Sequence, residues 1–215
     1  DVAGIDNFFV ALADHPNVQS VLAVGLGCET IQSQELAAKL LARNVSTQYR
    51  IIQESGGVEG TVAAGVAAAQ DLRAQYPERT VALSSLTIGI EVGRTVAQLD
   101  ELEKLLKSEG CSVVTVRSEG SSAEAFSRLA EARAHLIISF PDDNQPASGF
   151  PLIPVINVAG NGVLHQAIAG DFDSQEVNLL TEILALLNKV VAGSQTIAEK
   201  NRSGEIRAPR VVRSV

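Results

Sequence analysis

Short apolar runs alternate along this chain with longer segments in which apolar residues recur every three or four positions. The apolar runs predict strands at residues 19–26, 48–53, 80–91, 111–116, 134–140 and 152–158. The periodic segments predict helices at residues 6–13, 33–42, 61–75, 93–108, 121–132, 161–169 and 177–191. Because strand and helix alternate repeatedly, we predict an α/β fold with a doubly wound, mostly parallel, Rossmann-like sheet flanked by helices.

The longest stretch of turn-forming residues, 141–149, follows the fifth predicted strand. It indicates either an active-site loop or a boundary between lobes. We therefore predict a Rossmann-like lobe at residues 1–140, and a strand-helix portion at residues 141–215 that packs on the same core. Near the last long helix, Asp173 precedes Glu176 by three residues, a spacing that favours a cap at the start of that helix.

The composition narrows the possible partners. A net charge of -8 and a pI near 4.9 argue against a nucleic-acid partner, which needs a basic patch. The longest apolar runs are too short to span a bilayer and no signal peptide is visible, so we expect a cytoplasmic protein that does not contact membranes. The two cysteines indicate no disulfide framework. A homodimer is only a general expectation.

Polar residues follow several of the predicted strands. Cys28 and Glu29 come directly after the first strand, residues 53–57 (QESGG) end the second, and Glu91 ends the third. In an open parallel sheet the carboxyl ends of the strands form one edge, where ligands bind. We therefore predict that these carboxylates gather at one edge of the sheet.

Two readings remain open for the first of these groups. Cys28 is either a small buried apolar residue or a functional thiol, as a metal ligand or as a thiolate at a helix N-terminus. The neighbouring Glu29 favours the metal, because a carboxylate raises the pKa of an adjacent thiol. Glu29 itself could simply complement the dipole of the following helix.

The glycine-containing turns also allow more than one interpretation. Residues 53–57 form either a simple glycine turn capped by Ser55 or a turn whose N–H groups hold a substrate carboxylate. The sequence Gly25-Leu26-Gly27 resembles the start of a dinucleotide-binding fingerprint, but Thr30 stands where its third glycine should be. The nucleotide reading is therefore the weakest. The three histidines are interpreted as structural residues.

Several of these motifs, in this order, resemble the altronate/galactarate dehydratase family. They are residues 25–29 (GLGCE), residues 52–57 (IQESGG) followed by 61–65 (TVAAG), residues 150–158 (FPLIPVINV) with Asn161, and residues 171–173 (DFD). The resemblance implies metal-assisted dehydration of a sugar acid such as altronate or galactarate, usually with Fe²⁺. Related lyases include a sulfolactate sulfo-lyase, which eliminates sulfite instead of water.

The resemblance also implies roles for particular residues. Cys28 and Glu29 are expected to bind the metal, and Glu54 to lie near the substrate. From their places at the ends of predicted strands, Glu54 and Glu91 are the candidate catalytic carboxylates, with a structural role as the alternative for Glu91. Contacts with the substrate are expected from Gln53, Ser55, Gly56, Gly57 and Asn161. Which carboxylate acts as the base stays open at this point.

The chain departs from the family pattern at places that matter for catalysis. The family's Cys-Gly-Gly-Ser-Asp motif and Asn-Pro segment are absent, since Glu91 is followed directly by Val92-Gly93-Arg94. A Thr-Gly-Arg-Gly loop and an early His-Gln-His-Gly-Cys stretch are absent too. Either mobile loops are missing from the sequence as read, which the lack of any methionine favours, or the chain is a paralogue that binds without catalysing. The first alternative predicts a break between Glu91 and Val92.

Overall fold

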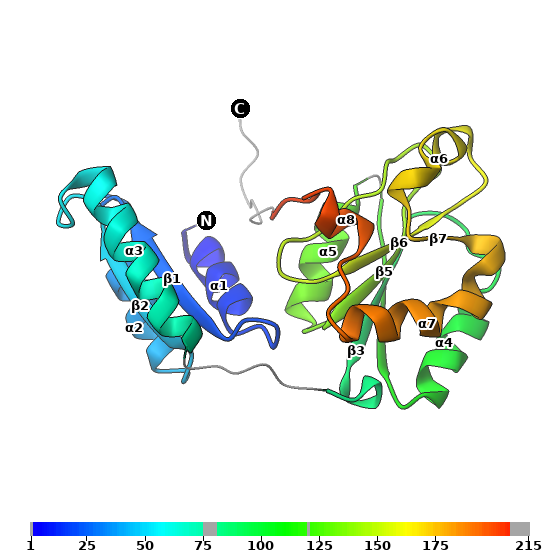
Figure 1. The fold of residues 1–215 in the computed structure, drawn as a ribbon, viewed down its shortest axis with the longest axis horizontal. Helices are drawn as coiled ribbons and strands as arrows, with labels where there is room; N and C mark the ends of the chain where they lie inside the picture. Colours follow the sequence, from blue (N-terminus) through cyan, green and yellow to red (C-terminus); the bar gives the residue numbers. More distant parts are fainter. Residues whose placement is uncertain (1, 75–80, 120, 207–215) are drawn as a thin grey trace. The chain divides into compact units, whose positions relative to one another are not determined.

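The computed structural model describes residues 2–74, 81–119 and 121–206, which form two compact units (Figure 1). The division falls at residues 79/80. The boundary predicted at residues 140/141 instead lies within the second unit, between two strands that pair with each other. The predicted end of one helix at residue 75 and start of one strand at residue 80 lie outside the described residues.

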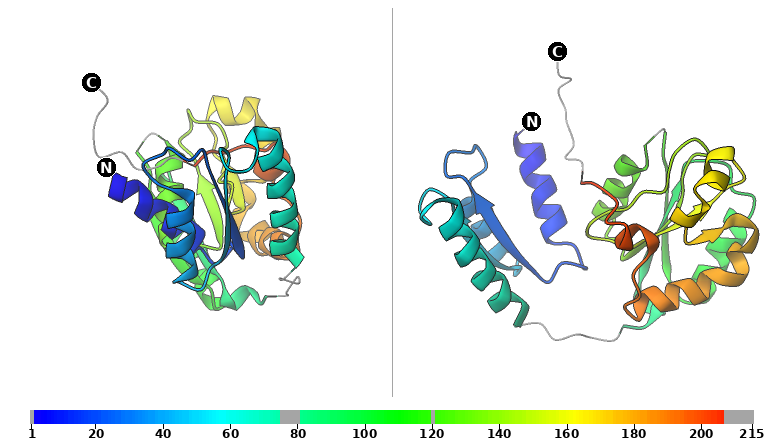
Figure 2. Two further views of the ribbon diagram at one scale, coloured as in Figure 1. Left: turned by 90° about the vertical axis from the view of Figure 1, so that its left-hand side faces the viewer. Right: turned by 45° about the horizontal axis from the view of Figure 1, so that its top comes forward.

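The first unit is a small βα structure. Its elements are α1 (Val2–Ala13), β1 (Ser20–Gly25), α2 (Ser33–Leu41), β2 (Ser46–Ile51) and α3 (Gly57–Ala74). The two strands pair in parallel, from Ser20 opposite Ser46 to Gly25 opposite Ile51. Figure 2 shows α2 and α3 on opposite faces of this two-stranded sheet. Each helix turns an apolar face inward, with Leu40 of α2 and Leu72 of α3 almost completely buried.

The second unit contains a five-stranded parallel sheet. Its main elements are β3 (Thr87–Val92), α4 (Leu99–Ser108), β4 (Ser112–Arg117), α5 (Ser122–Glu131), β5 (Leu136–Phe140), β6 (Val155–Ala159), α6 (Val163–Ala167), β7 (Ser174–Gln175), α7 (Leu179–Val191) and α8 (Ile197–Lys200). The strands lie in the order β4-β3-β5-β6-β7, which is 2-1-3-4-5 when counted from β3. This order is one of the common doubly wound arrangements. The predicted fold class is therefore confirmed, although the strands belong to two sheets.

Helices cover both faces of the second sheet, with α4 and α7 on one face and α5 on the other (Figure 1). Leu102 and Leu106 of α4 join Ile183 and Leu187 of α7 in one apolar core with the strands. Every residue of β5 and β6 is buried, as expected for central parallel strands that are covered on both faces.

Some predicted boundaries differ from the structure for identifiable reasons. The helix predicted from residue 93 begins only at Leu99, because Arg94 and the backbone N–H of Ala97 bind Glu176 instead of continuing a helix. β7 and α8 were not predicted, since both are too short for a periodic pattern. The expected break between Glu91 and Val92 is not found: β3 is continuous there, with Glu91 opposite Val116 and Val92 opposite Arg117.

The predicted cap by Asp173 is wrong. Its carboxylate accepts hydrogen bonds from the backbone N–H groups of Asn157, at the centre of β6, and Ile197, at the start of α8, both at 2.9 Å. The final long helix, α7, begins at Leu179 after a 3-10 turn. Burial raises the pKa of the Asp173 carboxyl despite these bonds. Asp173 thus joins two elements distant in sequence.

No helix in the described ranges combines the length and apolar character that a bilayer crossing requires.

Candidate functional site

The carboxyl ends of β1 and β2 bring the first two predicted groups of site residues together. The strands remain hydrogen-bonded past their last paired residues: the N–H of Ile52 donates to Gly25 O at 2.9 Å, and the N–H of Gln53 to Leu26 O at 3.3 Å. Residues 25–29 and 52–57 therefore form one edge. The prediction of a polar edge is correct within this unit.

Glu29 folds back onto the glycine turn that precedes it. Its carboxylate accepts hydrogen bonds from the backbone N–H of Gly27, at 2.6 Å, and from that of Leu26. These bonds, that of Gly27 first, lower the pKa of Glu29 below its usual value. The turn therefore holds a carboxylate, and in this structure the carboxylate is the protein's own.

Glycine at position 27 is required by the backbone and by the neighbouring side chains. Its φ of 117° is unfavourable for other residues. A Cβ atom at this position would lie 2.8 Å from Gln53 Oε1 and 3.0 Å from Ile51 Cγ2. Gln53 thus packs directly against the turn that holds Glu29.

The second turn of this edge leads into α3. Gly56 and Gly57 both have a φ of 80°, and a Cβ atom on either would meet no other atom within 4 Å. The turn is therefore open on this side. The first N–H groups of α3 have no partner within the helix, although that of Gly57 donates to Ile52 O at 3.1 Å. The helix dipole adds positive potential there. The side chain of Glu54 is exposed beside this turn.

Of the two predicted metal ligands, Cys28 is exposed and Glu29 is partly exposed in the structure. A protein-bound divalent cation takes four or more ligands in total, usually at least three of them from the protein. Across the described ranges, no group of three or more His, Cys, Asp or Glu side chains is placed to hold a metal ion. The Cys28–Glu29 pair therefore does not by itself fit a metal centre.

Glu91 lies in the second unit and is completely buried. Three serine hydroxyls donate to its carboxylate: Ser118 and Ser122 to Oε1, the latter at 3.2 Å, and Ser139 to Oε2 at 2.8 Å. Ser122 is the first residue of α5, so the helix N-terminus also favours the negative charge. Ser118 follows β4, Ser122 begins α5 and Ser139 lies in β5, so the three hydroxyls come from segments that surround β3. Glu91 is held as a structural carboxylate, inaccessible to a substrate in this conformation.

Asn161, predicted to contact the substrate, is exposed after β6 in the second unit, and its carbonyl accepts from Gln166 Nε2 at 3.0 Å. The structure thus brings Cys28, Glu29 and residues 53–57 together in the first unit. It places Glu91 and Asn161 in the second. The residues predicted to share one sheet edge therefore lie at the edges of two separate sheets.

Sequence reasoning missed a charged cluster at the carboxyl ends of β3, β5 and β6. Arg94 forms ion pairs with Glu176 and, at 3.7 Å, with Asp143. Its guanidinium also lies 5.5 Å from the centre of the Phe140 ring. The only local signal was an arginine directly after a strand and a glycine. Its partners are far apart in sequence, so the pattern could not reveal them.

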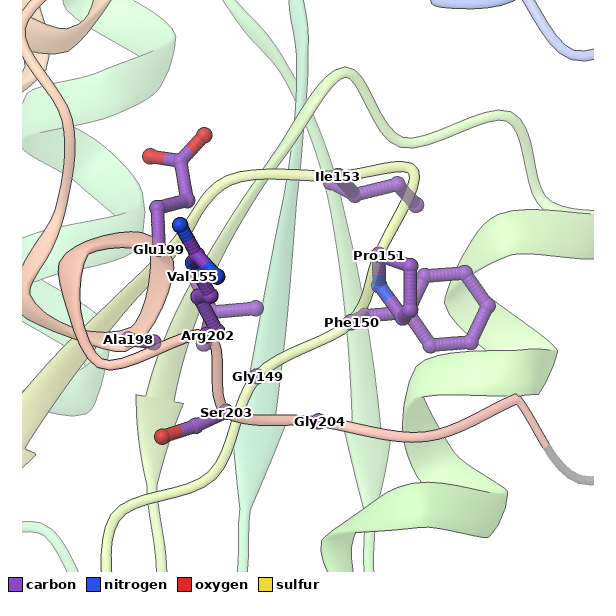
Figure 3. Close-up of a pocket in the computed structure, with 10 residues that line it drawn as sticks. All are labelled: Gly149, Phe150, Pro151, Ile153, Val155, Ala198, Glu199, Arg202, Ser203 and Gly204. Atoms are coloured by element: carbon purple, nitrogen blue, oxygen red, sulfur yellow. The ribbon is translucent and has the colours of Figure 1, made fainter.

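A pocket of about 270 Å³ lies at the opposite, amino end of β6 (Figure 3). It is lined by Gly149, Phe150, Pro151, Ile153, Val155, Ala198, Glu199, Arg202, Ser203 and Gly204. Figure 3 shows Glu199 and Arg202 on one side, and Phe150 and Pro151 on the other. Glu199 also accepts a hydrogen bond at 2.8 Å from the N–H of Thr196, as part of the α8 cap. None of the predicted site residues lines this pocket.

Comparison with protein families bears on the edge of the first unit. The model described as "D-galactarate dehydratase/Altronate hydrolase, second domain" covers residues 1–76. Residues 1–76 match this family. The match confirms the resemblance for the segment that contains Cys28, Glu29 and residues 53–57, and it does not extend to Glu91 or Asn161. No curated protein matches the chain.

Proposed function

We propose that this protein acts on a sugar acid such as altronate or galactarate, as a hydro-lyase, and that the carboxyl edge of β1 and β2 binds the acid group. The observation that carries the proposal is the geometry of this edge. One glycine turn already holds a carboxylate through backbone N–H groups, and the second opens beside it at the start of an 18-residue helix. The dehydratase and hydrolase activities named in the family description agree with a ligand of this class.

The second turn is the proposed receptor for the substrate carboxylate. Glu29 already occupies the N–H groups of Leu26 and Gly27, whereas Gly56 and Gly57 are unobstructed on the side of a Cβ atom. The N–H of Gly57 donates to Ile52 O at 3.1 Å, so the N–H groups that follow it in the first turn of α3 are the ones proposed to bind a carboxylate without a cationic side chain. This explains how an acidic protein could bind an acidic ligand, because the attraction is local.

In the proposed reaction, Glu54 is the base. Its exposed carboxylate takes the proton from the carbon next to the substrate carboxylate. The neighbouring carbon–oxygen bond breaks and a carbon–carbon double bond forms. The departing hydroxide takes up a proton from solvent and leaves as water, and Glu54 returns its proton to solvent. The resulting enol rearranges to a 2-keto acid. Fe²⁺ is the metal that the family resemblance implies, but the donor set in the described residues of the first unit does not fit a metal centre.

The activity test is formation of a 2-keto acid from galactarate and from altronate by the purified full chain, with and without added Fe²⁺. Glu54→Gln is expected to lower the rate by about 10²-fold or more, the usual contribution of a general base. Asp71→Asn removes an exposed carboxylate further along α3 and is expected to keep the wild-type rate. Equal rates for the Glu54 variant and the wild type would contradict the role of Glu54.

A second function, sugar-acid binding without dehydration, is favoured by Glu91. The Glu91 carboxylate is buried and accepts hydrogen bonds from three serines. The Cys-Gly-Gly-Ser-Asp motif of the family would follow Glu91, but here β3 continues directly from Glu91 to Val92. Saturable binding of galactarate without any 2-keto product, under all metal conditions, would support this second function over the first.

A further inference from the structure

The pocket at the amino end of β6 combines apolar walls with a charged rim (Figure 3). Of its lining residues, Phe150, Ile153 and Val155 are almost completely buried. Glu199 and Arg202 are exposed, so the pocket is reached from solvent. Sites for small molecules are mostly apolar with a few polar groups, and their volumes start at about 300 Å³. A volume of about 270 Å³ therefore fits a small ligand with an apolar body.

One side of the pocket is formed by two backbone segments in direct contact. A Cβ atom on Gly149 would lie 2.5 Å from Ser203 O, and one on Gly204 would lie 2.3 Å from Gly149 O. The segments approach this closely because both residues are glycines. Figure 3 shows Gly149, Ser203 and Gly204 together along this side. The wall is therefore closely packed, and it fixes the outline of the pocket without a side chain.

Arg202 occupies a backbone position that usually carries glycine. It follows the C-cap of α8 in a Schellman motif: its N–H donates to Glu199 O at 3.1 Å, and the N–H of Ser203 donates to Ala198 O at 2.9 Å. The φ of Arg202 is 52°, a left-handed conformation that is unfavourable for residues with a Cβ atom. Arg133 has the same position after α5, with a φ of 62°, but it does not line the pocket. Arg133 is therefore a matched reference for Arg202.

The binding chemistry of the rim depends on which of its two charges is free. The carboxylate of Glu199 is already engaged, because its Oε2 accepts a hydrogen bond from the N–H of Thr196 at 2.8 Å. The guanidinium of Arg202 forms no hydrogen bond or ion pair with the described part of the chain. A guanidinium can pair with a carboxylate through two parallel hydrogen bonds. The free charge at this rim is therefore cationic and suited to a carboxylate.

We infer that this pocket binds a small monocarboxylate with an apolar body, such as an aromatic or branched aliphatic acid. The carboxylate pairs with Arg202, and the apolar body lies against Phe150 and Pro151, which Figure 3 shows across the pocket from Arg202. A sugar acid does not fit the pocket, because apolar walls leave its hydroxyls without hydrogen-bond partners. The site is therefore separate from the carboxylate site proposed for the first unit, and it does not depend on the proposed function.

The test is an amide NMR titration of the full chain with four probes. Benzoate, benzyl alcohol and benzylamine share an aromatic body and carry an anionic, a neutral and a cationic head group. Galactarate carries acid groups without an apolar body. Benzoate is expected to give saturable shifts at residues 149, 150 and 202–204. Its affinity is expected to exceed that of each other probe about tenfold or more, the effect of a hydrogen bond between charged groups.

Variants of Arg202 separate the effect of its charge from its effect on stability. Arg202→Gln removes the charge and keeps part of the aliphatic stem, so it is expected to bind benzoate about tenfold more weakly and benzyl alcohol as the wild type does. Arg202→Gly relieves the left-handed strain, so it should keep or raise the Tm and still lose the preference for benzoate over benzyl alcohol. The matched control is Arg133→Gly, which relieves the same strain after α5 and is expected to bind benzoate as the wild type does.

Three results would overturn the inference. They are the absence of saturable benzoate shifts at residues 149, 150 and 202–204, equal or tighter binding of another probe there, and wild-type benzoate binding by Arg202→Gln. Tighter binding of benzylamine would show that Glu199 determines the charge of the rim. If Arg202→Gly lowers the Tm, the Arg202→Gln result decides the question. The carboxylate site of the proposed function is tested at residues 56–58 with galactarate, so it fails or succeeds separately.

Discussion

The serine network around Glu91 makes a quantitative prediction about stability. Ser139→Ala removes one of the three donors to a completely buried carboxylate. Hydrogen bonds to charged groups contribute about 1.5–3 kcal/mol. We therefore expect the free energy of unfolding to fall by about 2 kcal/mol. A protein of this size loses about 2–4 °C in Tm for each kcal/mol, so the expected decrease in Tm is roughly 4–8 °C.

The matched control is Ser127→Ala in α5. Ser127 is also buried, but its hydroxyl donates at 3.1 Å to the backbone carbonyl of Ala123, which carries no net charge. Alanine is the better helix former, so the loss for this variant is expected to stay within about 0.5 kcal/mol. The two variants thus compare a buried donor to a carboxylate with a buried donor to a carbonyl.

The assay is thermal and urea unfolding followed by far-UV circular dichroism, with hydrogen exchange to locate the effect. Ser139→Ala should reduce the protection of peptides from β3, β4 and α5, and leave that of β1 and β2 unchanged. Equal stability of the two serine variants would refute the structural role of Glu91. That result would favour a catalytic role for Glu91, which a conformational change would then have to expose.

Three further predictions concern single groups. The carboxyl of Glu29 should titrate by NMR with a pKa below its ordinary value of 4.5. Its contribution to the free energy of unfolding is then present above pH 4.5 and is lost as the pH falls through the lowered pKa. A midpoint at or above 4.5 would contradict the hydrogen bonds from the glycine turn. The carboxyl of Asp173 should titrate with a pKa above 3.8 because it is buried. Its contribution to the free energy of unfolding is fully present below pH 3.8 and is lost as the pH rises through the raised pKa. A midpoint below 3.8 would show that its two backbone hydrogen bonds outweigh burial. Gly27→Ala should destabilise the first unit by about 1–3 kcal/mol in urea unfolding, whereas Gly4→Ala in α1 should stabilise it slightly, and similar effects of the two would disprove the strain at residue 27.

The fold class could be predicted from sequence because buried parallel strands leave a strong signal. β5 and β6 are continuous apolar runs, and α4 and α7 carry clear apolar stripes. What the pattern could not show is which strands pair. A single chain of alternating strands and helices fits one sheet as well as two, because pairing is decided by contacts between distant segments.

The candidate site was predictable only where its residues are close in sequence or follow paired strands. Cys28, Glu29 and residues 53–57 meet because β1 and β2 are neighbours. The role of Glu91 was not predictable, since its serine partners lie 27, 31 and 48 residues further along the chain. The same distance effect concealed Arg94, whose partner Glu176 is 82 residues away.

The proposed binding of a sugar-acid carboxylate at the start of α3 is tested most directly by an amide NMR titration with galactarate. The account predicts saturable shifts at residues 56–58 that adipate reproduces, because it also carries a carboxylate, and that galactitol does not. The absence of shifts at residues 56–58, or equal shifts with galactitol, would contradict the account.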